Sequence, residues 1–245
     1  MYGDAYRRGF ERVSAFVQGR DTGVAVPATP DWSVGDVVRH LAGIANDLVQ
    51  GRIEGFASDD TTAMQVAQRS LVPVPAVLDE WASRLDDAAQ RLDHIDEAGF
   101  PDRIPSGIGP LPLAAIPPMI VNDLVHHEFD IRNAFGDVDG RDLPEILVSA
   151  AGHARSLRTL FAIRGLPTIR IESADTGQGW NIGRDEPVAT LRASSFELMR
   201  SIGGRRTRRE IASLDWDGDP EPFLDSMVLP QMRMRTSSLG EAHSS

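Results

Sequence analysis

The chain has 245 residues, no cysteine and a formal net charge of −11. Its length allows a sizeable core, and the missing cysteine excludes disulfides, thiolate metal ligands and a cysteine nucleophile. The acidic balance argues against generic nucleic-acid binding, because a phosphate backbone is held by a clustered basic surface. No apolar run is long enough to span a bilayer, so we expect a cytoplasmic protein with neither a nucleic-acid nor a membrane partner.

Helical periodicity predicts three long amphipathic helices in the first hundred residues. The first covers about residues 4–19, the second begins at Ser33 with the capping pattern S-x-x-D, and the third covers about residues 76–98. His40 lies at the edge of the apolar face of the second helix and should point inward. Segment 58–75 has a weak pattern and two prolines, so we treat it as a connection.

A fourth helix is predicted after a segment rich in proline and glycine, and it contains the stretch NDLVHHEFDIRNAFG at residues 122–136. Residues four apart lie above one another on a helix, so Asp123 and His127 share one face. His126 and Asp130 share another. Either pair could supply two ligands to a divalent metal, but holding zinc needs a third ligand from another element.

Four long helices with one proline-rich crossover are typical of a helix bundle, in which sites form from side chains that project inward from facing helices. His40 of the second helix could therefore meet Asp123 and His127 of the fourth. This meeting would complete a set of three ligands.

The chain changes character after a linker rich in glycine and aspartate at residues 136–142. A helix at residues 144–165 is followed by TIRIES at residues 168–173, which alternates like a strand and is predicted to begin a β-hairpin. Ser194 begins another helix, which ends at two glycines. The basic run at residues 205–209 is predicted to be a solvated face, with an anion site as the alternative.

These patterns predict an α+β protein with a four-helix bundle followed by a smaller mixed α/β domain. The expected parts are the bundle, the α/β domain and a flexible tail, at residues 1–139, 140–235 and 236–245 respectively.

Two motifs resemble a known family. ATPDWSVGDVVRHLAG at residues 28–43 and LVHHEFDIRNAFG at residues 124–136 resemble the mycothiol-dependent maleylpyruvate isomerase family, within the DinB-like superfamily of metal-binding four-helix bundles. The part from about residue 143 is similar to the smaller C-terminal domain of that family. The resemblance therefore covers nearly the whole chain.

The resemblance implies a divalent metal, usually zinc, held by one histidine of the second helix and a carboxylate–histidine pair of the fourth. The matching residues are His40, Asp123 and His127, and the family usually carries glutamate, longer by one methylene, at the position of Asp123. The resemblance also implies mycothiol as co-substrate. An arginine of the C-terminal domain is implicated in handling the acidic substrate, and Arg205 is the nearest by motif and our predicted catalytic residue.

Three residues near the predicted ligands have open roles. Asp130 could accept the free ring N–H of His127 and orient that imidazole, or it could pair with His126 or stay solvated. His126 points about 100° around the helix from His127, which favours pairing at the surface or behind the ligands. Arg132 could bind an acidic substrate or the carboxylate of a thiol, or remain a solvated arginine.

The predicted function is that of a metal-dependent, mycothiol-using isomerase or S-transferase acting on a small electrophile. Three protein ligands leave the fourth position of a tetrahedral zinc open for a water or a thiol, which loses its proton near neutral pH. The alternative is a non-catalytic member of the same fold that binds a small ligand or a metal. The expected partners are a small thiol and an electrophile, and the chain is expected to be a monomer or a homodimer.

Overall fold

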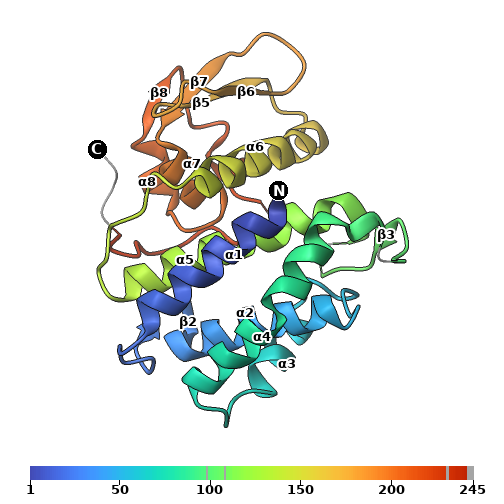
Figure 1. Ribbon diagram of the computed structural model, residues 1–245. Helices are drawn as coiled ribbons and strands as arrows, with labels where there is room; N and C mark the ends of the chain where they lie inside the picture. The colour runs from blue at the N-terminus through green and yellow to red at the C-terminus, as the bar shows by residue number, and fades with distance from the viewer. Residues whose placement is uncertain (98, 108, 230–231, 242–245) are drawn as a thin grey trace. The chain divides into compact units, whose positions relative to one another are not determined.

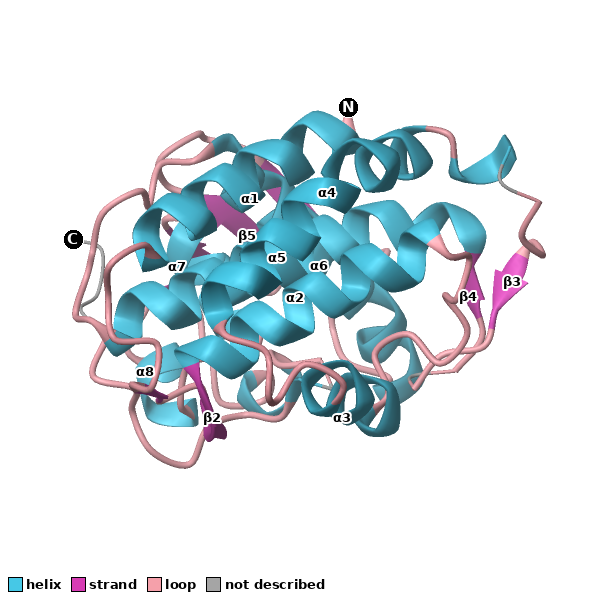
Figure 2. Ribbon diagram, turned by 60° about the horizontal axis from the view of Figure 1, so that its bottom comes forward, coloured by secondary structure: helices cyan, strands magenta, loops and turns pink. Residues whose placement is uncertain are grey.

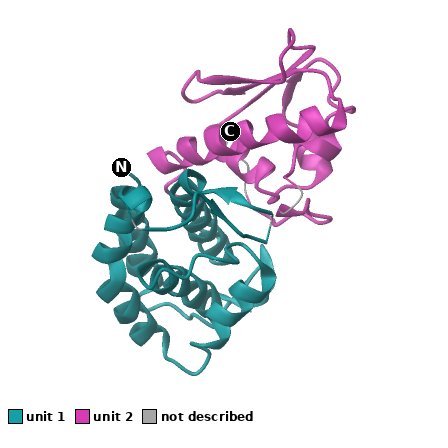
Figure 3. Cartoon of the chain, turned by 90° about the vertical axis from the view of Figure 1, so that its right-hand side faces the viewer, with its two compact units in different colours: residues 1–137 teal, residues 138–245 magenta. Residues whose placement is uncertain are grey.

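The computed structural model describes residues 1–97, 99–107, 109–229 and 232–241. The chain divides into two compact units, Met1–Asp137 and Val138–Ser245, called unit 1 and unit 2 (Figure 3). The division falls inside the segment rich in glycine and aspartate at residues 136–142. Within the described residues, no helix combines the length and apolar character needed to cross a membrane.

Unit 1 is built around four long helices that lie side by side (Figures 1 and 2). They are α1 (Tyr2–Val17), α2 (Val34–Val49), α4 (Val74–Asp93) and α5 (Ile116–Ala134). α1 and α2 each contact both α4 and α5, so every helix packs against two neighbours. Each helix sends apolar side chains into the shared core, among them the buried Val13, Leu41, Trp81 and Leu124.

The start of α2 is fixed by the predicted capping box. The side chain of Ser33 accepts the N–H of Asp36 at 3.2 Å, and the carboxylate of Asp36 accepts the N–H of Ser33 at 3.0 Å. Ser33 also ends a short antiparallel pair formed by β1 (Ala25–Val26) and β2 (Thr29–Ser33). Because the cap sets where the helix begins, it also sets which residues face the core.

The segment predicted to be a connection contains a helix, α3 (Asp59–Ala67), which is capped by Ser58 and packs on α2. Gln65 is its one buried residue, so α3 lacks the apolar stripe by which a helix is recognised in a sequence. After α3, the guanidinium of Arg69 donates to the carbonyl of Gln65 at 3.1 Å and pairs with Glu80 of α4 at 2.6 Å. This pairing holds the end of α3 against the bundle.

The segment rich in proline and glycine before α5 contains several short elements of regular structure. Its short elements are η1 (Ile95–Glu97), the antiparallel strands β3 (Arg103–Ile104) and β4 (Leu111–Pro112), and η2 (Leu113–Ala115).

Unit 2 combines helices with a four-stranded sheet of order β6-β5-β7-β8. The strands are β5 (Ile169–Ser173), β6 (Gly179–Ile182), β7 (Ala189–Ala193) and β8 (Asp215–Asp217), and the helices are α6 (Pro144–Arg164), α7 (Ser195–Ile202), α8 (Arg208–Ala212) and η3 (Leu224–Ser226). β5 and β6 form the predicted hairpin, and β7 joins β5 in parallel. β8 and α8 were not predicted. The two units together confirm the predicted α+β class.

The basic run at residues 205–209 departs from the predicted solvated face because one of its arginines is buried. Arg206 is 1% exposed and pairs with Glu197 at 2.8 Å and with Glu241, while Arg200 pairs with Glu241 at 2.8 Å. Burial alone would lower the pKa of Arg206, but the hydrogen bonds and charges of the two glutamates raise it above its ordinary value. We call these four side chains the arginine–glutamate cluster.

Within the predicted tail, Ser238 and Glu241 contact other residues of unit 2. Ser238 donates to Glu210 at 2.6 Å, and Glu241 is 8% exposed within the arginine–glutamate cluster. Charge-assisted hydrogen bonds from two guanidiniums hold this part of the chain in place. Residues 242–245 lie outside the described residues.

Candidate metal centre

Side chains of α2 and α5 converge at one point inside unit 1. Nε2 of His40 lies 3.3 Å from Oδ2 of Asp123, and Nε2 of His127 lies 3.7 Å from Oδ1 of the same carboxylate. One ligand atom from each of the three residues lies within 4.8 Å of the others. Both histidines are buried, whereas the Asp123 side chain is 30% exposed. The carboxylate is therefore the part of this cluster that solvent reaches.

The four-residue spacing on α5 explains why His127, rather than the adjacent His126, belongs to the cluster. Asp123 and His127 stand one turn apart on the same face of the helix. His126 is directed elsewhere on α5, and it is 3% exposed, so the surface position considered for it does not occur.

Asp130 lies in the position predicted for a partner of His127. Its Oδ2 is 3.3 Å from Nδ1 of His127, on the side of the imidazole away from Asp123, and its side chain is fully buried. Trp32 of β2 lies against both imidazoles, with ring centroids 5.3 Å from His40 and 6.2 Å from His127. The site thus has a carboxylate behind one histidine and an indole beside both.

A second polar contact, which the sequence did not predict, lies behind His40. Nδ1 of His40 is 2.8 Å from Oε1 of Gln65, and the Gln65 amide donates to Oδ2 of Asp47 at 2.8 Å. Asp47 follows His40 by seven residues on α2, a spacing that places it on the same helix face and could have identified it. Gln65 comes from α3, and no spacing in the sequence connects it with His40.

The partners of the two imidazoles determine which ring nitrogen carries the proton. An amide oxygen only accepts hydrogen bonds, so Nδ1 of His40 donates to Gln65 and carries a proton. The Asp130 carboxylate lies 3.3 Å from Nδ1 of His127 and favours a proton on that nitrogen. Nε2 of each ring faces the Asp123 carboxylate and is the nitrogen left to bind a metal. Two imidazole lone pairs and a carboxylate form a donor set that suits a divalent cation.

The distances from the Asp123 carboxylate to the two imidazoles are close to those of a zinc site. Zinc bonds of about 2.0–2.1 Å in tetrahedral geometry place neighbouring ligand atoms about 3.3–3.4 Å apart. The separations of 3.3 and 3.7 Å from the Asp123 carboxylate to the two imidazoles are close to that value. The aspartate is long enough to meet both histidines, and the residues present fit a metal.

Tyr6 of α1 adds a buried hydroxyl to the same region. Its oxygen accepts the indole N–H of Trp81 at 3.0 Å. Burial raises the pKa of Tyr6, the hydrogen bond from Trp81 opposes this rise, and the negative charge of Asp123 adds to it. Tyr6 therefore stays neutral at physiological pH.

The two arginines singled out in the sequence have other partners. Arg132 pairs with Glu128 at 3.3 Å and with Asp137 at 3.4 Å, contacts that occupy its guanidinium near the end of α5. Arg205 belongs to unit 2, is half-buried and donates to the carbonyl of Gly203 at 2.8 Å. The roles predicted for both in substrate handling stay predictions.

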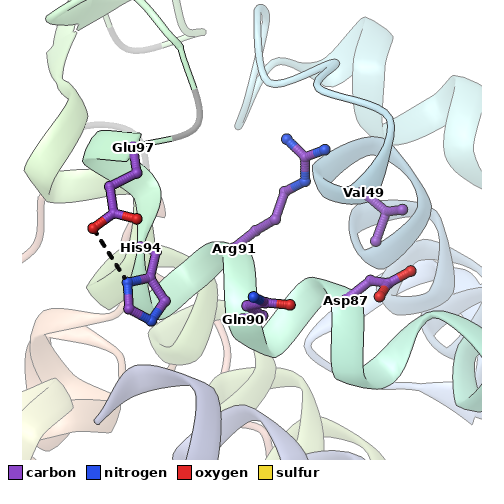
Figure 4. Close-up of a pocket in the computed structure, with 6 residues that line it drawn as sticks. All are labelled: Val49, Asp87, Gln90, Arg91, His94 and Glu97. Carbon is purple, nitrogen blue, oxygen red and sulfur yellow. Dashed lines mark ion pairs between the residues drawn. The ribbon is translucent and has the colours of Figure 1, made fainter.

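A surface pocket of about 530 Å³ in unit 1 offers a contrast (Figure 4). It is lined by Val49, Asp87, Gln90, Arg91, His94 and Glu97. His94 pairs with Glu97 at 3.6 Å and is 56% exposed, and the other polar side chains in Figure 4 do not gather around it. Among the described residues, the group of side chains placed to hold a metal is His40, Asp123 and His127.

Comparison with known proteins agrees with the motifs. Residues 5–132, just over half of the chain, match the family model described as the mycothiol maleylpyruvate isomerase N-terminal domain. The chain belongs to this family. The predicted resemblance is thereby confirmed, and all three residues of the cluster lie within the matched segment.

Two solved structures share the fold. One is the crystal structure of the mycothiol-dependent maleylpyruvate isomerase, with a TM-score of 0.59 and 15% identity, covering 83% of this chain and 88% of that one. The other is a histidine-to-alanine mutant described under the same name, with a TM-score of 0.58, 14% identity and the same coverage. A comparison with curated protein sequences found no match.

Proposed function

We propose that the chain is a metal-dependent, mycothiol-using isomerase or S-transferase that acts on a small electrophile. The family, and the fold shared with a mycothiol-dependent maleylpyruvate isomerase, support this general kind of activity. The observation that carries the proposal is the convergence of two imidazole Nε2 atoms and the Asp123 carboxylate inside the bundle.

His40, Asp123 and His127 would hold the metal, which we propose to be zinc. When bound, zinc lowers the pKa of a thiol or water at its open position. The two imidazoles would bind the metal through Nε2, because Nδ1 of each ring faces an acceptor. Trp32 covers one side of both rings and limits their contact with water.

The sulfur nucleophile must come from a co-substrate, because the chain contains no cysteine. In isomerisation the thiolate sulfur bonds to one carbon of an activated double bond, which becomes a single bond and rotates. Departure of the same thiolate restores the double bond, so no thiol is consumed. In transfer the new carbon–sulfur bond persists and the electrophile loses its leaving group or opens. We propose that Arg205 binds the acidic group of the substrate.

A second candidate function is binding without catalysis. It is favoured by Asp123, whose carboxylate is one methylene shorter than the glutamate usual at this position in the family. A change in how the carboxylate holds the metal could leave a site that binds a metal or small ligand and turns nothing over.

A thiol-dependent assay separates these functions. Purified protein is supplied with zinc, mycothiol and a panel of electrophiles that includes acids with an activated cis double bond. We expect turnover that requires the thiol and falls at least about 100-fold in His127→Ala, since a metal ligand is lost. His94→Ala removes an exposed histidine outside the site and is the matched control. Turnover without thiol, or full activity in His127→Ala, would contradict the proposal. Zinc binding without any turnover would favour the binding function.

A further inference from the structure

We infer that Gln65 and Asp47 are positioning residues that hold His40 in the tautomer and orientation needed to bind a metal. This inference rests on the metal site of the proposed function. The two residues extend the site beyond its three ligands, to the helix that the sequence pattern leaves as a connection.

The chemistry of the three side chains allows only one arrangement of their protons. The carboxylate of Asp47 pairs with Arg52 at 2.8 Å and can only accept, so the Gln65 amide must direct its NH₂ group to Asp47. The amide oxygen then faces His40, and because it too can only accept, Nδ1 of His40 carries the proton. Nε2, which lies 3.3 Å from the Asp123 carboxylate, is then the nitrogen left to bind a metal.

Burial makes this arrangement hard to replace. Gln65 is 5% exposed, His40 6% and Asp47 8%, so water has little access to either hydrogen bond. A buried polar group that loses its partner costs about 1–3 kcal/mol. The side chains are therefore held together far more firmly than an equivalent set at the surface.

The close packing of α3 on α2 also helps to place Gln65 beside His40. A Cβ on Gly43, one turn after His40 on α2, would lie 2.5 Å from the Cβ of Gln65, so the absence of a side chain there lets α3 approach. Arg69 then fixes the end of α3 through the Gln65 carbonyl and Glu80. These contacts place the side-chain amide of Gln65 against the imidazole of His40.

The two histidines of the site are thus supported in different ways. Behind His127 stands Asp130, a carboxylate from the same helix. Behind His40 stands a neutral amide from another helix, which passes the interaction on to Asp47. Partners of this kind fix the tautomer and direction of a metal-binding imidazole, and their loss typically weakens metal binding about 10–100-fold.

The tautomer can be measured directly in metal-free protein by NMR with ¹⁵N-labelled histidine, since the chain has only six histidines. The His40 signals are assigned by comparison with His40→Ala. In the unchanged protein we expect His40 as the Nδ1–H tautomer. In Gln65→Leu we expect a substantial population of the Nε2–H tautomer and zinc affinity, measured by chelator competition, about 10–100-fold lower. His127 should keep its tautomer.

Gln68→Leu is the matched control, because Gln68 is exposed at the end of the same helix and should change neither readout. Asp47→Asn preserves shape and frees the Gln65 amide to turn, so it should shift His40 in the same direction by a smaller amount, even if Gln65→Leu fails to fold. An unchanged His40 tautomer, or zinc affinity within about twofold of the original, would overturn the inference. Lack of zinc binding by the unchanged protein would instead contradict the proposed function, and the tautomer would still decide the role of Gln65.

Discussion

The two units each bury a cluster of ionisable side chains, but the clusters differ in kind. In unit 2, Arg200 and Arg206 meet Glu197 and Glu241, so groups with permanent positive charge lie against carboxylates. In unit 1 the Asp123 carboxylate faces the Nε2 atoms of two imidazoles, whose Nδ1 atoms face acceptors on the other side. The first cluster contains its own cations, whereas the second brings together two ring nitrogens and a carboxylate that could hold a metal ion.

This difference distinguishes the arginine–glutamate cluster, which stabilises unit 2, from the candidate metal site of unit 1. In the arginine–glutamate cluster the carboxylates are already paired with guanidiniums. Arg200 of α7 holds Glu241 by two hydrogen bonds. Two imidazoles beside a carboxylate suit a cation that comes from solution. Loss of an arginine should therefore destabilise unit 2, whereas loss of a histidine should remove metal from unit 1.

The largest expected effect comes from breaking the cluster of unit 2. Arg206→Ala leaves two buried glutamates with too little positive charge, a change that typically costs about 3–5 kcal/mol of unfolding free energy. Urea unfolding measures this loss, while the zinc content of unit 1 should not change. Arg208→Ala, which removes an exposed arginine paired with Glu221 and Asp225, should have a far smaller effect. Equal losses in the two variants would contradict the assignment.

The next effect is a pH dependence in unit 2. Burial, and secondarily the charge of Arg205, lowers the pKa of His153 to about 4. The folded protein therefore favours neutral His153, and stability is lost as the pH falls from about 6.5 toward 4. The loss is about 3 kcal/mol. The free energies of unfolding of the original chain and of His153→Gln, measured in urea over this pH range, should diverge by this amount. Parallel curves would show that His153 titrates normally.

A smaller effect is expected behind the metal site. Asp130→Asn weakens the acceptor facing Nδ1 of His127 without changing its shape, so zinc affinity should fall about tenfold. Asp137→Asn alters a carboxylate that pairs with Arg132 and should leave zinc affinity unchanged. Chelator competition measures both variants. Equal zinc affinity in the two variants would show that Asp130 does not support metal binding by His127.

The sequence was sufficient to identify much of the bundle and its central cluster. Apolar residues at helical spacing located three of the four long helices, and the Ser33 capping pattern located the start of α2. Asp123 and His127 are four residues apart on one helix, so local geometry was enough to pair them. The choice of His127 over His126 came from the family pattern, and the structure places His127 in the cluster.

The features that were missed depend on contacts that leave no local pattern. Gln65 is the one buried residue of α3, and a single polar residue gives no periodic signal. Glu241 lies in a segment of serine and glycine that reads as disordered, and its partners Arg200 and Arg206 are more than thirty residues earlier. Tertiary ion pairs and amide contacts of this kind become visible only when the chain is folded.

The most direct test of the account is the zinc content of protein purified without added metal. We predict close to one zinc per chain in the original protein and in His94→Ala, and little or none in His40→Ala, because two remaining ligands rarely hold zinc. An original protein without zinc, or a His40→Ala variant that retains it, would contradict the claim that His40, Asp123 and His127 form a metal centre.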